Sequence, residues 1–239
     1  MSTQFPPNMS EKTITNKTVP KKETKLITID GPAGAGKSSV AKQLAAQIGF
    51  YYLDTGALYR TVALLGLKNQ VDWNDPAALV SLTQKNLIDY RAGRVYLNQE
   101  DVSEQIRSSE ITFLTQYSSK NPAIRLLMND LQRKIATTDH FVTEGRDQGS
   151  VVFPDAFRKF YLTASPEERA RRRFKEQQQR GENVDYQQIL IDINERDYRD
   201  SHRDVAPLIQ PKGAIIIDSD GKSLDEVVEL MKRHIEMPD

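Results

Sequence analysis

The run LITIDGPAGAGKSSVAKQLAAQIGF, residues 26–50, joins a short apolar stretch to a glycine-rich loop and then to a helix-like segment. From Gly31 to Ser38 its spacing is G-x4-G-K-S, the phosphate-binding loop pattern. Glycines let the backbone curl around an anion with its N–H groups turned inward, and the helix adds the positive end of its dipole. In this pattern the lysine reaches the β- and γ-phosphates, and the serine hydroxyl ligates Mg²⁺. The residues expected around the triphosphate of a bound nucleotide are Gly31, Pro32, Ala33, Gly34, Ala35, Gly36, Lys37, Ser38 and Ser39.

Short apolar runs alternate with helical stretches along the rest of the chain. The runs that we interpret as strands are 26–29, 51–53, 141–143, 159–162 and 214–217. Helices are expected at 37–48, 57–67, 122–136, 166–180, 185–199 and 223–236. Because the apolar runs do not alternate with polar residues, they are typical of strands buried on both faces. The sequence therefore predicts an α/β fold with a doubly wound, five-stranded parallel sheet.

Two segments stand outside this repeat. Residues 70–121 contain a turn at 91–94 between two short strands, which predicts a small insertion with its own hairpin. Residues 166–205 are rich in arginine. We expect Ser165 to cap the helix that starts at Pro166, with Glu168 completing a capping box. Residues 25–239 are interpreted as one domain.

Composition narrows the possible functions. The chain has 239 residues, 33 basic and 33 acidic, and no cysteine. Zero net charge disfavours a general nucleic-acid or membrane-surface binder, and the lack of cysteine excludes disulfides and thiolate metal sites. Residues 1–24 are polar and carry no apolar core of a signal peptide, so we interpret them as a disordered leader. We expect a cytoplasmic protein, and a monomer because no long apolar face is left over.

A phosphate-binding loop also requires a carboxylate near the metal, usually at the end of a neighbouring strand. Glu144 follows directly after an apolar run and is the first candidate for a Mg²⁺ site with Ser38. Asp30, which ends the first strand beside the loop, is the second.

Three further clusters bear on what receives the phosphate: DTGALYR at 54–60, EGRDQGSVVFP at 144–154 and ERDYRDSHRDVAP at 195–207. On a helix, Arg196, Asp200 and Arg203 share one face. A solvated surface helix laced with ion pairs is the alternative for this cluster. Arginine grips phosphate bidentately, while a carboxylate accepts hydrogen bonds from the amino group of a base such as cytosine. The mixture therefore indicates a small phosphorylated nucleoside as the acceptor.

Taken together, IDGPAGAGKSS, LDTGALYR, EDVSEQIR, EGRDQGSVVFPDA, SPEERARRR and ERDYRDSHRDVAPL resemble the bacterial cytidylate kinases, from about residue 25 to the end of the chain. The resemblance implies transfer of phosphate from Mg·ATP to CMP and dCMP. It also implies an NMP-binding insertion at about 70–121 and a short helical lid at about 166–185.

The resemblance implies a role for individual residues as well. Carried over by motif, Arg125 and Asp147 face the cytosine, and Arg196 and Asp200 lie by the ribose. The CMP phosphate is surrounded by Arg60, Arg146 and Arg203, with Thr55 in the same pocket, while Arg169, Arg172 and Arg173 belong to the lid. Lys37, Arg146 and the lid arginines are the expected catalytic residues, and no general base is assigned because the attacking phosphate oxygen is already ionised.

Departures from the family pattern are few. Gln116 stands where relatives carry a serine that touches the base, Glu144 replaces an aspartate, and Thr55 replaces a serine. Three other functions stay open. One is a kinase of a different small acceptor, such as UMP, another nucleotide, shikimate or a sugar acid. Another is a nucleotide-regulated binding module, and the third is a nucleic-acid binder that uses RARRRFK at 169–175.

Overall fold

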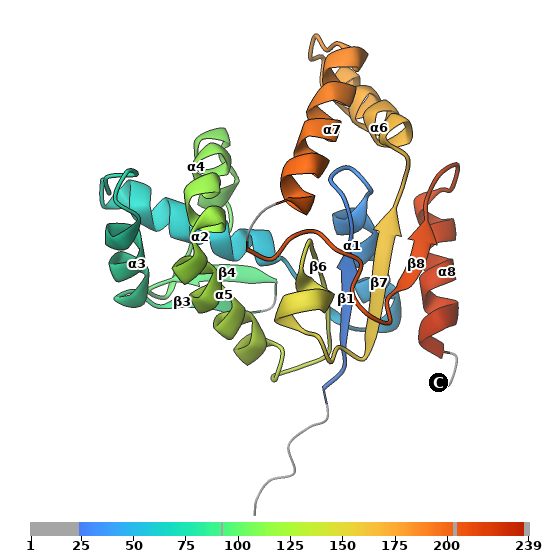
Figure 1. Cartoon of the computed structure of the whole chain (residues 1–239). Helices are drawn as coiled ribbons and strands as arrows, with labels where there is room; N and C mark the ends of the chain where they lie inside the picture. Colours follow the sequence, from blue (N-terminus) through green and yellow to red (C-terminus); the bar gives the residue numbers. More distant parts are fainter. Residues whose placement is uncertain (1–23, 92, 203–204, 237–239) are drawn as a thin grey trace, which may run out of the picture.

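The computed structural model describes residues 24–91, 93–202 and 205–236. Its main sheet has five parallel strands in the order β2-β6-β1-β7-β8 (Figure 1). These strands are β1 (Leu26–Asp30), β2 (Tyr51–Leu53), β6 (Phe141–Gly145), β7 (Arg158–Thr163) and β8 (Ile215–Asp218). The predicted five-stranded parallel sheet is confirmed, and each predicted apolar run falls on one strand. The leader predicted at 1–24 lies outside the described residues except for residue 24.

Strand β1 lies at the centre of the sheet, which explains its apolar sequence. Ile27 and Ile29 are fully buried because strands and helices cover them on every side. In the register, Asp30 pairs with Gly145 of β6 and with Tyr161 of β7. The carboxyl ends of these three strands therefore meet at one edge, and the glycine-rich loop leaves β1 beside the segment that follows β6.

Helices cover both faces of the sheet. Helices α1 (Lys37–Ile48) and α8 (Leu224–Glu236) share one apolar core with Val142 of β6. Helices α2 (Thr55–Lys68) and α5 (Pro122–Ile135) share a second core with Phe141. Neighbouring strand residues point to opposite faces, so Phe141 and Val142 place the two cores on opposite sides of the sheet. The doubly wound arrangement is confirmed.

Residues 70–121 form a distinct group beside the sheet (Figure 1). The predicted hairpin is present, since Arg91 pairs antiparallel with Arg94. The sequence interpretation missed a third strand and two helices in this segment. The elements are α3 (Pro76–Gln84), β3 (Ile88–Arg91), β4 (Arg94–Leu97), β5 (Glu100–Asp101), the 3₁₀ turn η1 (Gln105–Arg107) and α4 (Ser109–Lys120). Strand β5 escapes prediction because it has only two residues.

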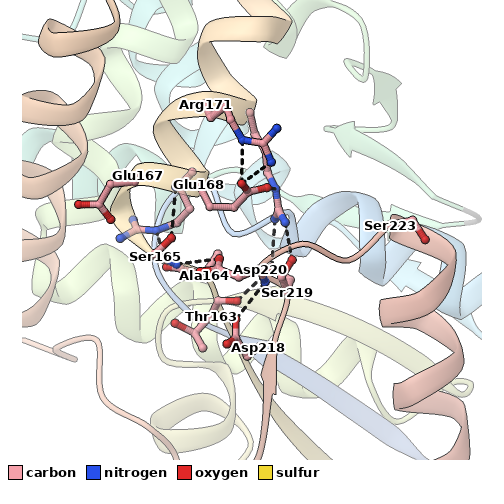
Figure 2. Close-up of polar contacts among 12 residues, drawn as sticks. Thr163, Ala164, Ser165, Glu167, Glu168, Arg171, Asp218, Ser219, Asp220 and Ser223 are labelled. Atoms are coloured by element: carbon pink, nitrogen blue, oxygen red, sulfur yellow. Dashed lines mark hydrogen bonds and ion pairs between the residues drawn. The ribbon is translucent and has the colours of Figure 1, made fainter.

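Helices α6 (Pro166–Gln179) and α7 (Tyr186–Ser201) stand side by side above the loop end of the sheet (Figure 1). Ser165 caps α6 as predicted, because its Oγ accepts from the Glu168 N–H at 3.3 Å. The predicted capping box is wrong. The Ser165 N–H donates to Asp220 Oδ1 at 2.9 Å, and the Glu168 carboxylate accepts instead from Arg171 and Arg172 (Figure 2).

Candidate active site

A cleft of about 820 Å³ opens at the carboxyl ends of β1 and β6. Its walls come from the glycine-rich loop, from α2, α4 and the start of α5, from the segment after β6, and from α6 and α7. The sequence-predicted residues that line it are Ala33, Gly34, Gly36, Lys37, Ser38, Ser39, Thr55, Arg60, Arg125, Glu144, Arg146, Asp147, Arg172, Arg196 and Asp200. Gly31, Pro32, Ala35, Arg169 and Arg173 are not among the lining residues, and Arg203 lies outside the described residues.

The loop itself depends on two glycine conformations. Gly31 has a φ of 150°, and a Cβ there would lie 2.0 Å from the carbonyl oxygen of Leu162. Any side chain would therefore push the loop off β7. Gly36 has a φ of 88° and precedes the first residue of α1, so the chain enters the helix from a left-handed conformation. This geometry leaves the amino end of α1 open toward the cleft, where an anion is favoured.

Lys37 is buried beneath the loop, and its Nζ donates to the Pro32 carbonyl at 2.7 Å. Burial, and next the positive charge of Arg146, lower the pKa of Lys37 to about 7. An ammonium group with so little solvent gains from an anionic partner, since a nearby negative charge favours its protonated form. The lysine is thus suited to a bound polyphosphate.

Two oxygen-bearing side chains meet at the junction of α1 and β6. Ser38 Oγ donates to Glu144 Oε1 at 2.7 Å, and the Tyr52 hydroxyl lies 3.4 Å from the same oxygen. The described residues hold no group of three or more His, Cys, Asp or Glu that forms a closed metal cage. Mg²⁺ bound with nucleotides needs no such cage, because phosphates and waters fill most of its coordination positions. Ser38 and Glu144 are hard oxygen donors that fit this requirement.

Asp30, the second metal candidate from the sequence, is turned away from the cleft. Its carboxylate is buried and accepts from the N–H groups of Gln148 at 2.8 Å and Gly149 at 2.6 Å. Burial raises the pKa of Asp30 to about 6, although these two backbone hydrogen bonds oppose the rise. Asp30 therefore fixes the start of the single π-helical turn η2 (Gln148–Val152), directly after Asp147.

A buried ion pair forms one wall of the cleft. Arg125 Nη2 bonds to Asp147 Oδ2, and both side chains are more than nine-tenths buried. Arg125 also donates from Nη1 to the Ser119 carbonyl at 3.3 Å, and it lies 5.8 Å from the Tyr59 ring centre. Removing two charges from water is costly unless each is paired, so this pair is held in one geometry. It presents a fixed donor and acceptor surface to the cleft.

A second charged group lines the same cleft. Arg146 Nε donates to Asp200 Oδ2 at 2.9 Å, and Arg196 Nε lies 4.0 Å from the same oxygen. The predicted shared face of Arg196 and Asp200 on α7 is present. Desolvation and next the charge of Arg146 lower the pKa of Arg196, whose side chain is still half exposed. Two guanidinium groups share one carboxylate, so the surplus positive charge favours an anion in the cleft.

At the start of α2, Asp54 caps the helix by accepting from the Ala57 N–H at 2.9 Å. The same carboxylate pairs with Arg60 Nη2 at 3.1 Å. Thr55 Oγ1 donates to the Glu144 carbonyl at 3.2 Å. The DTGALYR segment is therefore attached to β6 through Thr55 and lines the cleft through Thr55 and Arg60.

The arginines of α6 do not form one group. Arg169 is buried, with bonds to the carbonyls of Ala164 and Ala33 and to Asp197. Arg172 lines the cleft but is bound to the Ser219 carbonyl at 2.5 Å and Oγ at 3.0 Å. Arg173 is exposed. The contacts around Ser219, Asp220 and Ser165 join the start of α6 to the ends of β7 and β8 (Figure 2).

Some cleft residues were not found from the sequence. They are Gly56, Tyr59, Thr115, Ser119, Gly145, Gln148 and Glu176. Gln116 lines a separate pocket with Trp73 and Tyr117 instead. Thr115 and Ser119 have the i, i+4 spacing of one helix face, which is a usable signal once α4 is known to border the cleft.

The fold and the cleft define a P-loop protein whose glycine-rich loop shares its cleft with the charged group of Arg146, Arg196 and Asp200. Residues 27–237 match the family described as cytidylate kinase. The cytidylate kinase of Caldanaerobacter subterraneus subsp. tengcongensis is 47% identical over 203 residues, which cover 85% of this chain and 91% of that protein. That of Rhodopirellula baltica is 45% identical over 208 residues, or 87% and 91% of the two chains. The chain belongs to the cytidylate kinase family, which confirms the resemblance seen in the sequence and identifies it as a phosphotransferase.

Among solved structures, the shikimate kinase of Bacteroides thetaiotaomicron is similar with a TM-score of 0.46 and 13% identity, covering 89% of this chain and 99% of that one. In the part of the chain that the structure describes, every helix is too short or too polar to span a membrane.

Proposed function

We propose that this protein transfers the γ-phosphoryl group of Mg·ATP to CMP and dCMP in the cleft, giving ADP and CDP or dCDP. One observation carries the proposal. A phosphate-binding loop, a surplus of positive charge at Arg146 and Arg196, and a buried Arg125–Asp147 pair all line the same cleft. Each of the three fits a different part of the substrate pair.

The donor end is the loop from Gly31 to Ser39. Its N–H groups and Lys37 hold the triphosphate, and binding of that anion raises the pKa of Lys37 from its low value in the free protein. Ser38 and Glu144 hold Mg²⁺. When bound, Mg²⁺ offsets negative charge on the phosphates during transfer.

The acceptor end discriminates the base. Asp147 accepts a hydrogen bond from the exocyclic amino group of cytosine, a pairing that uracil cannot make. Arg125 keeps the Asp147 carboxylate in one orientation because the two side chains are paired and buried. A substrate without the amino group makes no hydrogen bond to this carboxylate and is therefore disfavoured. Thr115 and Ser119 on α4 complete the wall around the base.

The CMP phosphate lies against Arg60 and Arg146, and we propose that Arg203 joins them. Arg196 and Asp200 lie by the ribose, and Thr55 belongs to the same pocket. Arg146 acts on the transferred group as well as on the acceptor. Arginine is always charged and binds phosphate through a planar fork, so it stabilises charge that develops in the transition state. No residue is required as a base because the attacking phosphate oxygen is ionised at neutral pH.

The lid proposal covers residues 166–185, with Arg172 and Arg173 closing over the triphosphate. Closure excludes water, which would otherwise compete as acceptor. Since Arg172 is bound to Ser219, it must exchange that contact for a phosphate or act from its present position. We retain a monomer in the cytoplasm as the proposed state, as expected from the sequence.

The test is release of ADP from Mg·ATP with CMP, dCMP, UMP, AMP, GMP or no acceptor. CMP and dCMP should dominate the rates. Equal ADP release without an acceptor would instead indicate a nucleotide-regulated module, and a higher rate with UMP would exclude the base contact assigned to Asp147.

A further inference from the structure

Arg169 uses all of its guanidinium nitrogens inside the protein. Its side chain is 3% exposed. Nε donates to the Ala164 carbonyl at 3.0 Å, Nη1 donates to the Ala33 carbonyl at 2.9 Å, and Nη2 lies 2.6 Å from Asp197 Oδ2. Each of the three nitrogens thus has a partner in the protein, and the residue does not line the cleft. The lid role carried over to Arg169 from the sequence does not fit this arrangement.

The three partners belong to three different parts of the site. Ala33 lies in the phosphate-binding loop, Ala164 lies between β7 and α6, and Asp197 lies on α7. Contact with the loop is close, since a Cβ on Gly34 would lie 3.3 Å from the Arg169 Cβ. A movement of the loop therefore cannot occur without a response from Arg169.

Asp197 connects Arg169 to α7, the helix whose Arg196 and Asp200 line the cleft. On α7 it follows Arg196 directly, and Asp200 comes one helical turn later. Both of those side chains line the cleft, and Asp200 holds Arg146. The direction in which they point depends on the rotation of α7, which the Arg169–Asp197 ion pair helps to fix together with the packing of Ile189 and Ile193 against α6. One buried guanidinium thus joins the donor loop to the helix that carries acceptor residues.

We propose that Arg169 and Asp197 are positioning residues that couple ATP binding to CMP binding. The inference rests on the proposed function, because it assigns ATP to the loop and CMP to the wall beside α7. When the loop closes on a triphosphate, the Ala33 carbonyl and Arg169 settle into one geometry, and α7 is held in the rotation that binds CMP. Such coupling is reciprocal, so CMP strengthens ATP binding by the same factor.

A purely structural ion pair would make the same contacts, so stability alone cannot test the idea. The coupling factor can, because it compares the dissociation constant of CMP with and without a bound donor. We would measure it by calorimetry with the β,γ-methylene analogue of ATP and Mg²⁺, which fills the loop without transferring phosphate.

Asp197→Ala is the first variant, because it cuts the contact to α7 and leaves both backbone bonds of Arg169 in place. Asp192→Ala is its matched control. Asp192 is an exposed aspartate on the same helix, and its Oδ1 accepts a hydrogen bond from Gln188 Nε2 at 2.9 Å. Arg169→Lys is the second variant. Lysine keeps the charge but cannot span the three partners, and it decides the question if Asp197→Ala does not fold.

In the native protein we expect the analogue to tighten CMP binding by about 5-fold or more. The factor should fall below about 2-fold in Asp197→Ala and in Arg169→Lys and stay native in Asp192→Ala. A native protein without coupling, or variants that keep the native factor, would overturn the inference. A native protein that does not phosphorylate CMP would overturn the proposed function instead, so the two failures are distinguishable.

Discussion

Two kinds of arginine surround the cleft, and they differ in which protein groups contact their guanidinium nitrogens. Arg169 and Arg172 on α6 are bound to backbone carbonyls of the loop and of the β8 end. Arg146 and Arg196 share a single carboxylate and face the cleft. In the first kind every guanidinium nitrogen has a partner in the protein, so Arg172 binds a phosphate only by exchanging its Ser219 contact or through its remaining N–H groups. The second kind has fewer partners and keeps more donors for a ligand. A dense run of arginines therefore does not by itself mark a phosphate site.

The number of protein acceptors around a guanidinium group therefore distinguishes an arginine that holds the protein together from one that binds a ligand. Arginine has five N–H donors, and an anion can use only those that the protein leaves open. The predictions below test this distinction, from the largest expected effect to the smallest.

Replacement of a ligand-facing arginine should damage chemistry more than folding. Arg146→Ala should lower kcat by about 10²- to 10³-fold, because a preorganised positive group at the transferred phosphate is lost. The dissociation constant of ATP should change little. Steady-state kinetics and calorimetry check both values, with Arg233→Ala on the exposed face of α8 as the control. An unchanged kcat would place Arg146 with the satisfied arginines.

The buried Arg125–Asp147 pair has features of both kinds, because the two side chains bond to each other and also line the cleft. Asp147→Asn should raise the KM for CMP by about 10- to 100-fold while leaving the KM for ATP near its native value, because the acceptor for the cytosine amino group is altered. The ratio of rates with CMP and UMP measures the loss of selectivity. Asp130→Asn, an exposed position on α5, is the control. Equal losses for ATP and CMP would indicate general damage.

Lys37 extends the comparison to a buried cation. Its ammonium group has three N–H donors, of which one bonds to the Pro32 carbonyl. Because the pKa of Lys37 is lowered to about 7 in the free protein, it is increasingly neutral above that pH, and a bound triphosphate requires the charged form. Apparent ATP affinity should therefore fall by up to about tenfold per pH unit above 7, with proton uptake on binding. Calorimetry at pH 8 in buffers of different ionisation enthalpy detects that uptake. Its absence would contradict the assignment.

Arg171 provides the smallest effect and the sharpest contrast within α6. Arg171 lies between Arg169 and Arg172 in the sequence, but its side chain is 68% exposed and pairs with Glu168. Exposed pairs of this kind contribute little, so Arg171→Ala should change the free energy of unfolding by less than about 1 kcal/mol. Denaturant titration and the standard kinase assay check this. A loss comparable to that of Arg146→Ala would refute the distinction.

The sequence predicted the main sheet and much of the cleft because their signals are local. The loop pattern, the buried strand runs and the helix caps each lie within a few residues. The orientations of the α6 arginines are not local. Ala33 is 136 residues from Arg169, and Ser219 is 47 residues from Arg172. Only the tertiary fold supplies these acceptors, so the sequence interpretation placed Arg169, Arg172 and Arg173 together in the lid.

Two smaller misses have the same cause. The Ser165 N–H found Asp220, 55 residues away, instead of the nearby Glu168. The second miss is Thr115, which lines the cleft. On α4 a shift of one residue rotates a side chain by about 100°, so the neighbouring Gln116 lines a separate pocket instead. The sequence alone does not tell which face of a helix lines the cleft, because that depends on the elements against which the helix packs.

The position of β1 also has a consequence for how the chain folds as it leaves the ribosome. β1 and β2 are synthesised first, yet they are not neighbours, because β6 lies between them. Neither has a partner in the main sheet until residues 141–145 emerge, and β1 acquires its second neighbour only with β7 at 158–163. Until then the central strand stays an unpaired apolar segment, so its burial depends on translation reaching the second half of the chain.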